Sequence, residues 1–291
     1  MKETVLDLQA LKTFVLGIEF NSFALAAKHQ HKSTSAVSSH LKKLEQQTNA
    51  TLVRKEGRLL VPTAQGEQLL SYAKKMLALN DEALEALRWI DLQGTVSVGL
   101  QEDFSQGVLT ECLARFSRIN DQVQLNTMIE RYATLIASVQ DASLDVSVTW
   151  QGPVTTPYAE RIADTTIHWI AAPDFPLAQF LAAHQPVPLV VIEPNCLFKQ
   201  KATAALDAAG IRWQVVYQSQ SLSGIWPAVN AGIGITARPR IGCPETLVTA
   251  DETLPDLGRI GIQLHRSKPV IHGAGEKLIE SMARAIEASY G

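Results

Sequence analysis

The sequence predicts an α+β multidomain protein with a small helical head, one long helix and a larger α/β body. In the first 65 residues, apolar side chains recur at helical spacing and short turns interrupt them. Residues 64–92 contain no proline and one glycine near their start, which favours a single uninterrupted helix. From Gly94 onward, apolar strands alternate with helices. We therefore divide the 291 residues into domains 1–65, 66–92 and 93–291.

The composition excludes several classes of protein. Hydrophobic residues make up 46% and charged residues 19%, a balance typical of folded globular chains. No apolar run reaches the ~18 residues of a membrane helix, and the first residues lack the apolar core of a signal peptide. We therefore expect a cytoplasmic protein that does not enter a membrane.

The three cysteines, Cys112, Cys196 and Cys243, are odd in number and widely spaced. That pattern argues against a disulfide framework and against a clustered metal site. A redox pair formed by Cys196 and Cys243 is an alternative, but their apolar or proline neighbours favour ordinary packing. We expect neither a metal nor a cofactor.

Positive charge is concentrated in the head. Residues 1–75 carry 11 Lys and Arg against 6 Asp and Glu, whereas the whole chain has a net charge of −3. The remaining residues therefore carry a net −8. A basic segment joined to an acidic body is typical of a module that binds a polyanion.

The spacing of apolar and capping residues in the head predicts a helix-turn-helix. Leu8, Leu11, Phe14, Val15 and Ile18 mark a first amphipathic helix. Ser22 is placed to cap a second helix and Ser33 a third, and only a few residues separate these two helices. Two short helices joined by a sharp turn can place the second one in the major groove of DNA.

A hairpin and the long helix follow. Residues 52–63 contain two short apolar stretches around a charged turn, which predicts a wing with Arg54 and Arg58 near phosphate. Thr63 is placed to cap the long helix. Along that helix, apolar residues alternate in steps of four and three, as in a dimer seam. The predicted seam comprises Leu69, Ala73, Met76, Asn80, Ala83, Leu87 and Ile90. The alternative is a helix that packs only on its own domain.

In the body, alternating strands and helices predict mostly parallel sheets with ligands at the carboxyl ends of the strands. Gly232 and Gly234 lack the third glycine and acidic partner of a dinucleotide motif, so they indicate tight strand packing. The sequence has no Gly-x-Ser-x-Gly, no phosphate loop and no His-Glu-x-x-His.

The chain resembles the LysR-type transcriptional regulators over nearly its whole length. The matching positions are Leu6-Asp7-Leu8, Leu11, Phe14, Ser22-Phe23, Ala26-Ala27, Ser33, Ala36-Val37-Ser38, Leu41, Leu44-Glu45, Gly57-Arg58, Thr63, Gly66 and Ala231-Gly232-Ile233-Gly234-Ile235. Residues 236–239 and 80–83 resemble the branch that contains the LrhA/HexA-type repressors. The resemblance implies a winged helix-turn-helix, a linker helix and a two-subdomain effector domain like a periplasmic binding protein. Chain order then places subdomain I at about 94–163 plus 267–291 and subdomain II at about 164–266.

Within this framework we expect DNA contacts from the turn, the outer face of the third helix and the wing. The residues are Lys32, Ser33, Thr34, Ser35, Ser38, Ser39, Lys42, Lys43, Arg54, Arg58 and Thr63. Thr34-Ser35 stands where the family more commonly has Gln-Pro, and Ser39 stands where it often has Arg. The missing Gln and Arg are the residues that could make bidentate base contacts. Readout should therefore depend more on hydroxyls, water and DNA shape.

We expect an effector in the cleft between the subdomains, where strand ends and helix N-termini meet. The candidate residues are Gln101, Glu102, Asp103, Ser105, Thr149, Trp150, Asn195, Phe198, Ser219 and Ser221. Two acids at the mouth would disfavour a small anion, so a cationic, neutral or aromatic effector fits better, with Trp150 and Phe198 as walls.

The sequence is thus interpreted as a DNA-binding regulator that catalyses no reaction. Its expected partners are double-stranded DNA, a small effector and further copies of itself in a dimer of dimers, with RNA polymerase as another candidate. The competing hypothesis is a solute-binding protein or enzyme on the same lobes, whose N-terminal helices only oligomerise.

Overall fold

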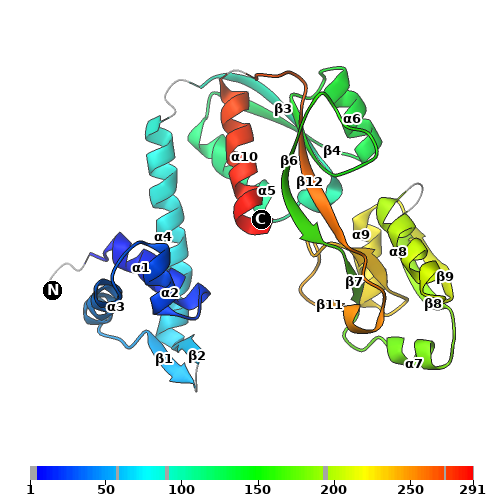
Figure 1. The fold of residues 1–291 in the computed structure, drawn as a ribbon. Coiled ribbons are helices and arrows are strands. Elements are labelled where there is room, and N and C mark those ends of the chain that lie inside the picture. Colours follow the sequence, from blue (N-terminus) through cyan, green and yellow to red (C-terminus); the bar gives the residue numbers. More distant parts are fainter. Residues whose placement is uncertain (1–4, 57–58, 89–91, 193–195, 272, 291) are drawn as a thin grey trace. The chain divides into compact units, whose positions relative to one another are not determined.

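The computed structural model describes residues 5–56, 59–88, 92–192, 196–271 and 273–290 (Figure 1). The chain divides into two compact units, residues 1–90 and 91–291. We describe each unit by itself. Within the described residues, no helix is long and apolar enough to span a membrane.

The head contains three helices whose starts are set by side-chain caps. They are α1 (Leu8–Glu19), α2 (Phe23–His29) and α3 (Thr34–Thr48). Asp7 accepts hydrogen bonds from the first backbone N–H groups of α1, and Ser22 and Ser33 do so for α2 and α3. The predicted caps of the second and third helices are therefore confirmed.

The turn between α2 and α3 is as short as predicted. His31 lies in the left-handed region at φ 51°, and the N–H of Lys32 donates to the carbonyl of Ala27 at 2.9 Å. The left-handed residue and this hydrogen bond end α2 and redirect the chain into α3. The two helices thus form a helix-turn-helix.

The hairpin and the long helix complete the first unit. Strands β1 (Val53–Glu56) and β2 (Leu59–Pro62) pair antiparallel, and α4 runs over Ala64–Arg88. A Cβ on Gly66 would come within 2.0 Å of the carbonyl oxygen of Leu52. The glycine is therefore what lets the first turn of α4 lie against the backbone before the hairpin.

One face of α4 belongs to the core of the head. Ala73 is fully buried in a cluster with Leu11, Phe14 and Leu44, and Leu69, Leu70 and Leu77 are partly buried against that cluster. Leu69 and Ala73 were predicted to lie in a dimer seam, and the structure corrects this. Leu87 and Ile90 of the predicted seam lie outside the described side chains.

The body contains a five-stranded sheet in the order β4-β3-β5-β12-β6. Its strands are β3 (Gly94–Leu100), β4 (Val123–Ile129), β5 (Val146–Trp150), β6 (Tyr158–Thr166) and β12 (Arg259–Arg266). The first three are parallel, whereas β12 pairs antiparallel with both β5 and β6. Helices α5 (Val108–Ile119) and α10 (Ala274–Tyr290) pack together beside it, and α6 (Tyr132–Gln140) packs on β5 and β12 (Figure 1).

The second part of the body is built on smaller sheets. Their strands are β7 (His168–Ala171), β8 (Val187–Ile192), β9 (Trp213–Ser219), β10 (Thr236–Arg238) and β11 (Val248–Thr249). The helices are α7 (Leu177–Ala182), α8 (Leu197–Ala208), α9 (Leu222–Asn230) and the short η2 (Asp251–Thr253), whereas the short η1 (Glu102–Phe104) follows β3 in the first part. Gly234 passes so close to β8 that a Cβ would meet the carbonyl oxygen of Pro188 at 2.5 Å. The predicted tight packing at this glycine is confirmed.

The crossovers between the two halves differ from the expected ones. The sequence assigned residues 164–266 to subdomain II, but β12 pairs with β5 over Ile262–Arg266 and therefore belongs to the sheet of subdomain I. The second crossover precedes Arg259 instead of following Arg266, because antiparallel pairing of β12 with β6 completes that sheet. Strand β6, helix α7 and strand β11 were not predicted.

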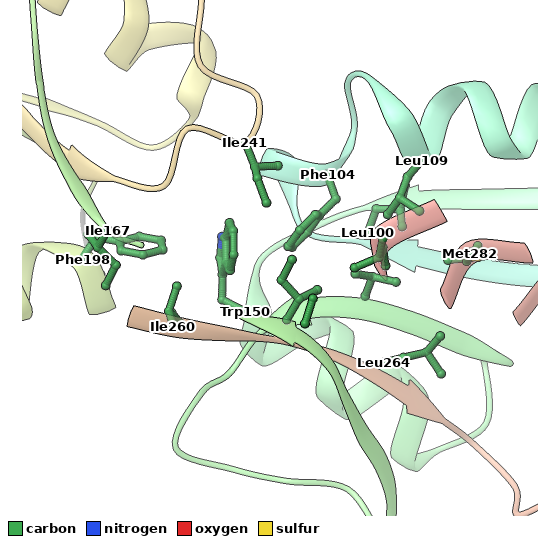
Figure 2. Packing of buried hydrophobic residues seen from close by; sticks show 14 of the residues in the cluster. Leu100, Phe104, Leu109, Trp150, Ile167, Phe198, Ile241, Ile260, Leu264 and Met282 are labelled. Carbon is green, nitrogen blue, oxygen red and sulfur yellow. The ribbon is translucent and has the colours of Figure 1, made fainter. Parts of the chain in front are cut away.

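The buried core of the body is continuous through both halves. Trp150 at the end of β5 lies between Phe104 and Phe198, with ring centroids 4.6 and 5.7 Å away (Figure 2). Phe198 comes from α8 and Phe104 from η1. Three aromatic rings therefore join the end of β5 to elements of both subdomains.

Candidate functional site

The outer face of α3 is polar and open. Val37 and Leu44 are fully buried on the inner face, while the hydroxyl side chains and one lysine face away from the core. The exposed residues of this face are Thr34, Ser35, Ser38, Ser39 and Lys42. Thr34, Ser38 and Lys42 follow one another at four-residue spacing, so they form one ridge along the helix. This arrangement agrees with the face that the sequence predicted.

Two predicted DNA-binding hydroxyls have structural partners. Ser33 accepts the N–H of Ala36 at 3.2 Å as the cap of α3. Thr63 donates to the carbonyl of Thr51 at 2.6 Å and accepts the N–H of Gly66 at 3.0 Å. Their positions are set by these bonds, so their side chains shape the site more than they contact it.

Several predicted phosphate-binding cations have intramolecular partners as well. The Lys32 ammonium donates to Gln9 at 2.9 Å, and Arg54 pairs with Glu56 at 2.7 Å. Lys43 pairs with Asp7, and this bond, together with the N–H of Ala10, lowers the pKa of Asp7 to about 2. All of these pairs lie at the surface, where water and salt screen them, so they can exchange for phosphate contacts. Arg58 lies outside the described residues.

The body contains a cavity of about 880 Å³ between its two halves. It is lined by the ends of β3 and β5 at Gln101 and Trp150, one side of α6 along its whole length, the loop 151–154, the start of α8 and the start of α9. Its wall includes six of the predicted effector residues: Gln101, Glu102, Asp103, Trp150, Phe198 and Ser221.

The other predicted effector residues do not line this cavity. Thr149 is fully buried and bonded to His265 at 3.1 Å. Ser105 donates to the carbonyl of Glu102 at 2.7 Å, and Ser219 donates to the carbonyl of Ser221 at 2.9 Å. For these three residues the effector-binding prediction is not supported. Asn195 lies outside the described residues.

The two acids at the mouth of the cleft, which the sequence analysis takes as open negative charge, are instead paired. Glu102 accepts the N–H of Leu222 at 2.8 Å and of Ser223 at 3.4 Å, at the start of α9. Asp103, 2% exposed, accepts the Nη2 of Arg238 at 2.6 Å, and Arg238 is 4% exposed. Each acid comes from subdomain I and each partner from subdomain II, so both contacts bridge the cleft.

Sequence reasoning missed the cationic part of the cavity. Arg131 lines it and donates to the carbonyl of Gln220 at 2.9 Å, and Arg238 lies over the ring of Phe198 at 4.7 Å. Tyr132 bonds both the N–H and the carbonyl of Val154. Burial raises the pKa of its hydroxyl. No periodicity links these residues, although Arg238 lies in the segment 236–239 on which the resemblance to one branch of the family rests.

None of the three cysteines, all of which lie in the described part of the chain, forms a disulfide. Cys196 precedes α8 and lines the cavity, whereas Cys243 donates weakly to the carbonyl of Pro244 at 3.5 Å. Burial raises the pKa of the Cys243 thiol, which disfavours the reactive thiolate.

A winged helix-turn-helix with an exposed polar α3, joined in one chain to an α/β body with a cleft, defines a ligand-responsive DNA-binding protein as the class. Residues 8–67 match the family of bacterial regulatory helix-turn-helix proteins of the lysR type. Residues 91–260 match the LysR substrate binding domain. The chain belongs to the LysR family of transcriptional regulators.

The relatives agree with this assignment. The transcriptional regulator PecT of Dickeya dadantii is 34% identical over 87% of this chain and 79% of its own length. The regulator DgdR of Burkholderia cepacia is 29% identical over 89% of this chain and 87% of its own. The chain is therefore a transcriptional regulator, and neither an enzyme nor a solute-binding protein.

The fold agrees with that of solved full-length regulators. The structure of Vibrio fischeri DarR in complex with DNA has a TM-score of 0.55 and 15% identity to this chain, over 97% of this chain and 99% of that one. At this identity the comparison supports the fold alone. It confirms the predicted order of winged helix-turn-helix, long helix and two-part α/β domain.

Proposed function

We propose that this chain reads an operator through the outer face of α3. The observation that carries the proposal is the ridge of Thr34, Ser38 and Lys42, exposed on a helix whose other face is anchored by Val37 and Leu44. Because Val37 and Leu44 hold α3 in place, the ridge is fixed in the major groove. Its hydroxyl groups contact the bases directly or through water, and DNA shape adds to the selectivity. The surface cations Lys32, Lys43 and Arg54, together with Arg58, bind phosphates and set the register of the protein on DNA.

The regulator also acts as a dimer of dimers built on α4. Beyond the face that packs in the head, α4 exposes Tyr72 (55%), Met76 (39%) and Leu79 (65%). Steps of four and three continue to Ala83, which is also exposed. Such a stripe is the seam that a second α4 would cover. Palindromic operator halves then match the two heads of a dimer.

A small effector in the cleft controls DNA binding, and RNA polymerase is the partner through which the bound regulator acts. The cavity is lined by both subdomains. A ligand that binds more tightly to one arrangement of the two subdomains than to another therefore shifts the equilibrium toward the arrangement that it prefers.

Gel shifts at several salt concentrations test the proposal, with the DNA upstream of the protein's own gene and with random DNA. We expect Arg54→Ala to weaken both complexes alike and to flatten the salt slope by about one, because one phosphate contact is lost. Ser38→Ala should instead lower the ratio of specific to random binding by about threefold to tenfold.

The matched control is Ser71→Ala, the same change at an exposed position of α4. It should leave both complexes unchanged. If Ser38→Ala also leaves the ratio unchanged while the protein binds its operator, α3 is not the reading element.

A further inference from the structure

The chain's own carboxylates already bind two groups of the cleft that could otherwise hold an anion. Glu102 takes the first two N–H groups of α9, and Asp103 takes the Arg238 guanidinium. We call these two contacts the latch. A helix N-terminus and a buried guanidinium are the groups that would otherwise hold a carboxylate or phosphate ligand.

An anionic ligand would therefore compete with groups that are already in place. To reach the α9 amides it must displace Glu102, which is tethered beside them. To reach Arg238 it must separate a pair that is almost fully buried, which leaves Asp103 charged without a partner. Both displacements are unfavourable, so the latch selects against anions.

The rest of the cavity is largely apolar. Ala133 and Ala137 present one side of α6 to it, and the loop after β5 adds Pro153 and Val154 to the wall. Val154 is 48% exposed and Ile129, also in the wall, is 52% exposed. The Tyr132 hydroxyl is already bonded to Val154. Apolar side chains left open in a large cavity favour an apolar occupant.

One polar group in the wall lacks a partner. Among the described residues the structure gives no acceptor for the indole N–H of Trp150, although this side chain is only 2% exposed. Trp150 belongs to the cavity wall between Phe104 and Phe198 (Figure 2). A carbonyl or hydroxyl oxygen on a ligand that opens this aromatic stack would satisfy the donor.

We propose that the cavity takes an uncharged, largely apolar molecule that carries a hydrogen-bond acceptor, because the latch already occupies Arg238 and the first N–H groups of α9. The proposal rests on the proposed function only where it takes this cavity as the effector site. It names the chemical class of the effector.

Two fluorescent probes that share one skeleton test the class on the full-length protein. N-phenylnaphthylamine is uncharged, and anilinonaphthalene sulfonate adds one anionic group. We expect the uncharged probe to bind the wild-type protein about tenfold more tightly or better. Glu102→Ala frees the α9 amides, so it should strengthen binding of the sulfonate. The ratio of the uncharged probe's affinity to the sulfonate's affinity should therefore fall.

Matched variants distinguish the effect of opening the latch from the effect of removing any negative charge. They also test whether the probe binds in this cavity. Glu130→Ala removes the same charge from the cavity wall but leaves α9 capped, so it should change the ratio less than Glu102→Ala does. Ala137→Trp fills the apolar side and should abolish binding of the uncharged probe. Thr134→Trp, on the same helix outside the wall, should not.

The proposal is overturned if the sulfonate binds the wild-type protein as tightly as the uncharged probe. It is also overturned if Glu102→Ala and Glu130→Ala shift the ratio equally, or if Ala137→Trp leaves binding intact. Gel shifts on the same preparations keep the two proposals apart: intact operator binding with failed probe selectivity refutes the ligand class and leaves the DNA-binding function standing.

Discussion

Serine residues in α3 show how position decides the role of a single side chain. Ser33 and Ser38 are both exposed and were both predicted to contact DNA. Ser33 precedes the first helical residue, so its hydroxyl accepts a backbone N–H. Ser38 lies one turn further on, where backbone N–H groups are used within the helix, and its hydroxyl points to solvent. Capping therefore separates a structural serine from a candidate reading serine.

His265 lies in an environment that disfavours its charged form. It is fully buried, with Thr149 at 3.1 Å on Nε2 and Thr156 at 3.0 Å on Nδ1. Thr149 also donates to the carbonyl of Trp150, so its oxygen accepts the Nε2 proton and Thr156 donates to Nδ1. Both nitrogens of a neutral ring are thereby satisfied. Burial lowers the pKa of His265 to about 4.

This lowered pKa predicts a loss of stability in mild acid. As pH falls from 6.5 to 4, the unfolded chain takes up the His265 proton and the folded protein does not. The free energy of unfolding should then drop by about 3 kcal/mol across that window, at ~1.4 kcal/mol for each pH unit, and be independent of His265 above it. Urea unfolding of the wild type and of His265→Gln at a series of pH values measures the effect. Parallel pH profiles in the two proteins would show that His265 does not titrate in this way.

At the scale of elements, α4 carries two apolar faces, one packed in the head and one exposed. Leu69, Ala73 and Leu77 pack in the head, while Met76 and Leu79 remain open in the single chain. The two stripes lie side by side along the helix, because Met76 is three residues after Ala73 and directly precedes Leu77. Of the seam that the sequence predicts, Ala73 lies in the core of the head and Met76 stays exposed.

We therefore expect Leu79→Asp to break dimers, because a charge in a buried seam costs several kcal/mol. Light scattering should report monomers, and operator affinity should fall by about a hundredfold or more as the second head is lost. Ala78→Asp is the matched control, since Ala78 is exposed and belongs to neither stripe. Dimers that persist in Leu79→Asp would move the interface off this helix.

At the scale of the whole molecule, the chain consists of two units with separate cores. Leu11 and Phe14 centre one core, and Trp150, Leu264 and Leu278 belong to the other. Because these described clusters share no member, each unit should unfold as its own cooperative transition.

Leu11→Ala tests this independence. Leu11 is fully buried, so the change should destabilise the head by about 2–5 kcal/mol. Scanning calorimetry should show the head's transition at a lower temperature, with the transition of the body unchanged. Leu278→Ala, fully buried in α10, should do the reverse. If either variant shifts both transitions together, the units unfold as one.

The predicted features that the structure confirms are local ones. The caps at Ser22 and Ser33, the short turn before α3 and the start of α4 after Thr63 depend on neighbours a few residues away. Their chemistry is readable from residue type and spacing. The order of head, long helix and α/β body follows from the change in periodicity along the chain.

Only the tertiary structure decided what the cleft is made of. Glu102 meets Leu222 and Asp103 meets Arg238, pairs separated by 120 and 135 residues. From sequence the two acids were interpreted as open charge at the mouth, because a long-range partner leaves no local pattern. The antiparallel position of β12 was hidden for the same reason: pairing partners are chosen by the packing of the whole sheet. Local physics thus determined the elements and their order, and long-range pairing determined the charge and shape of the site between them.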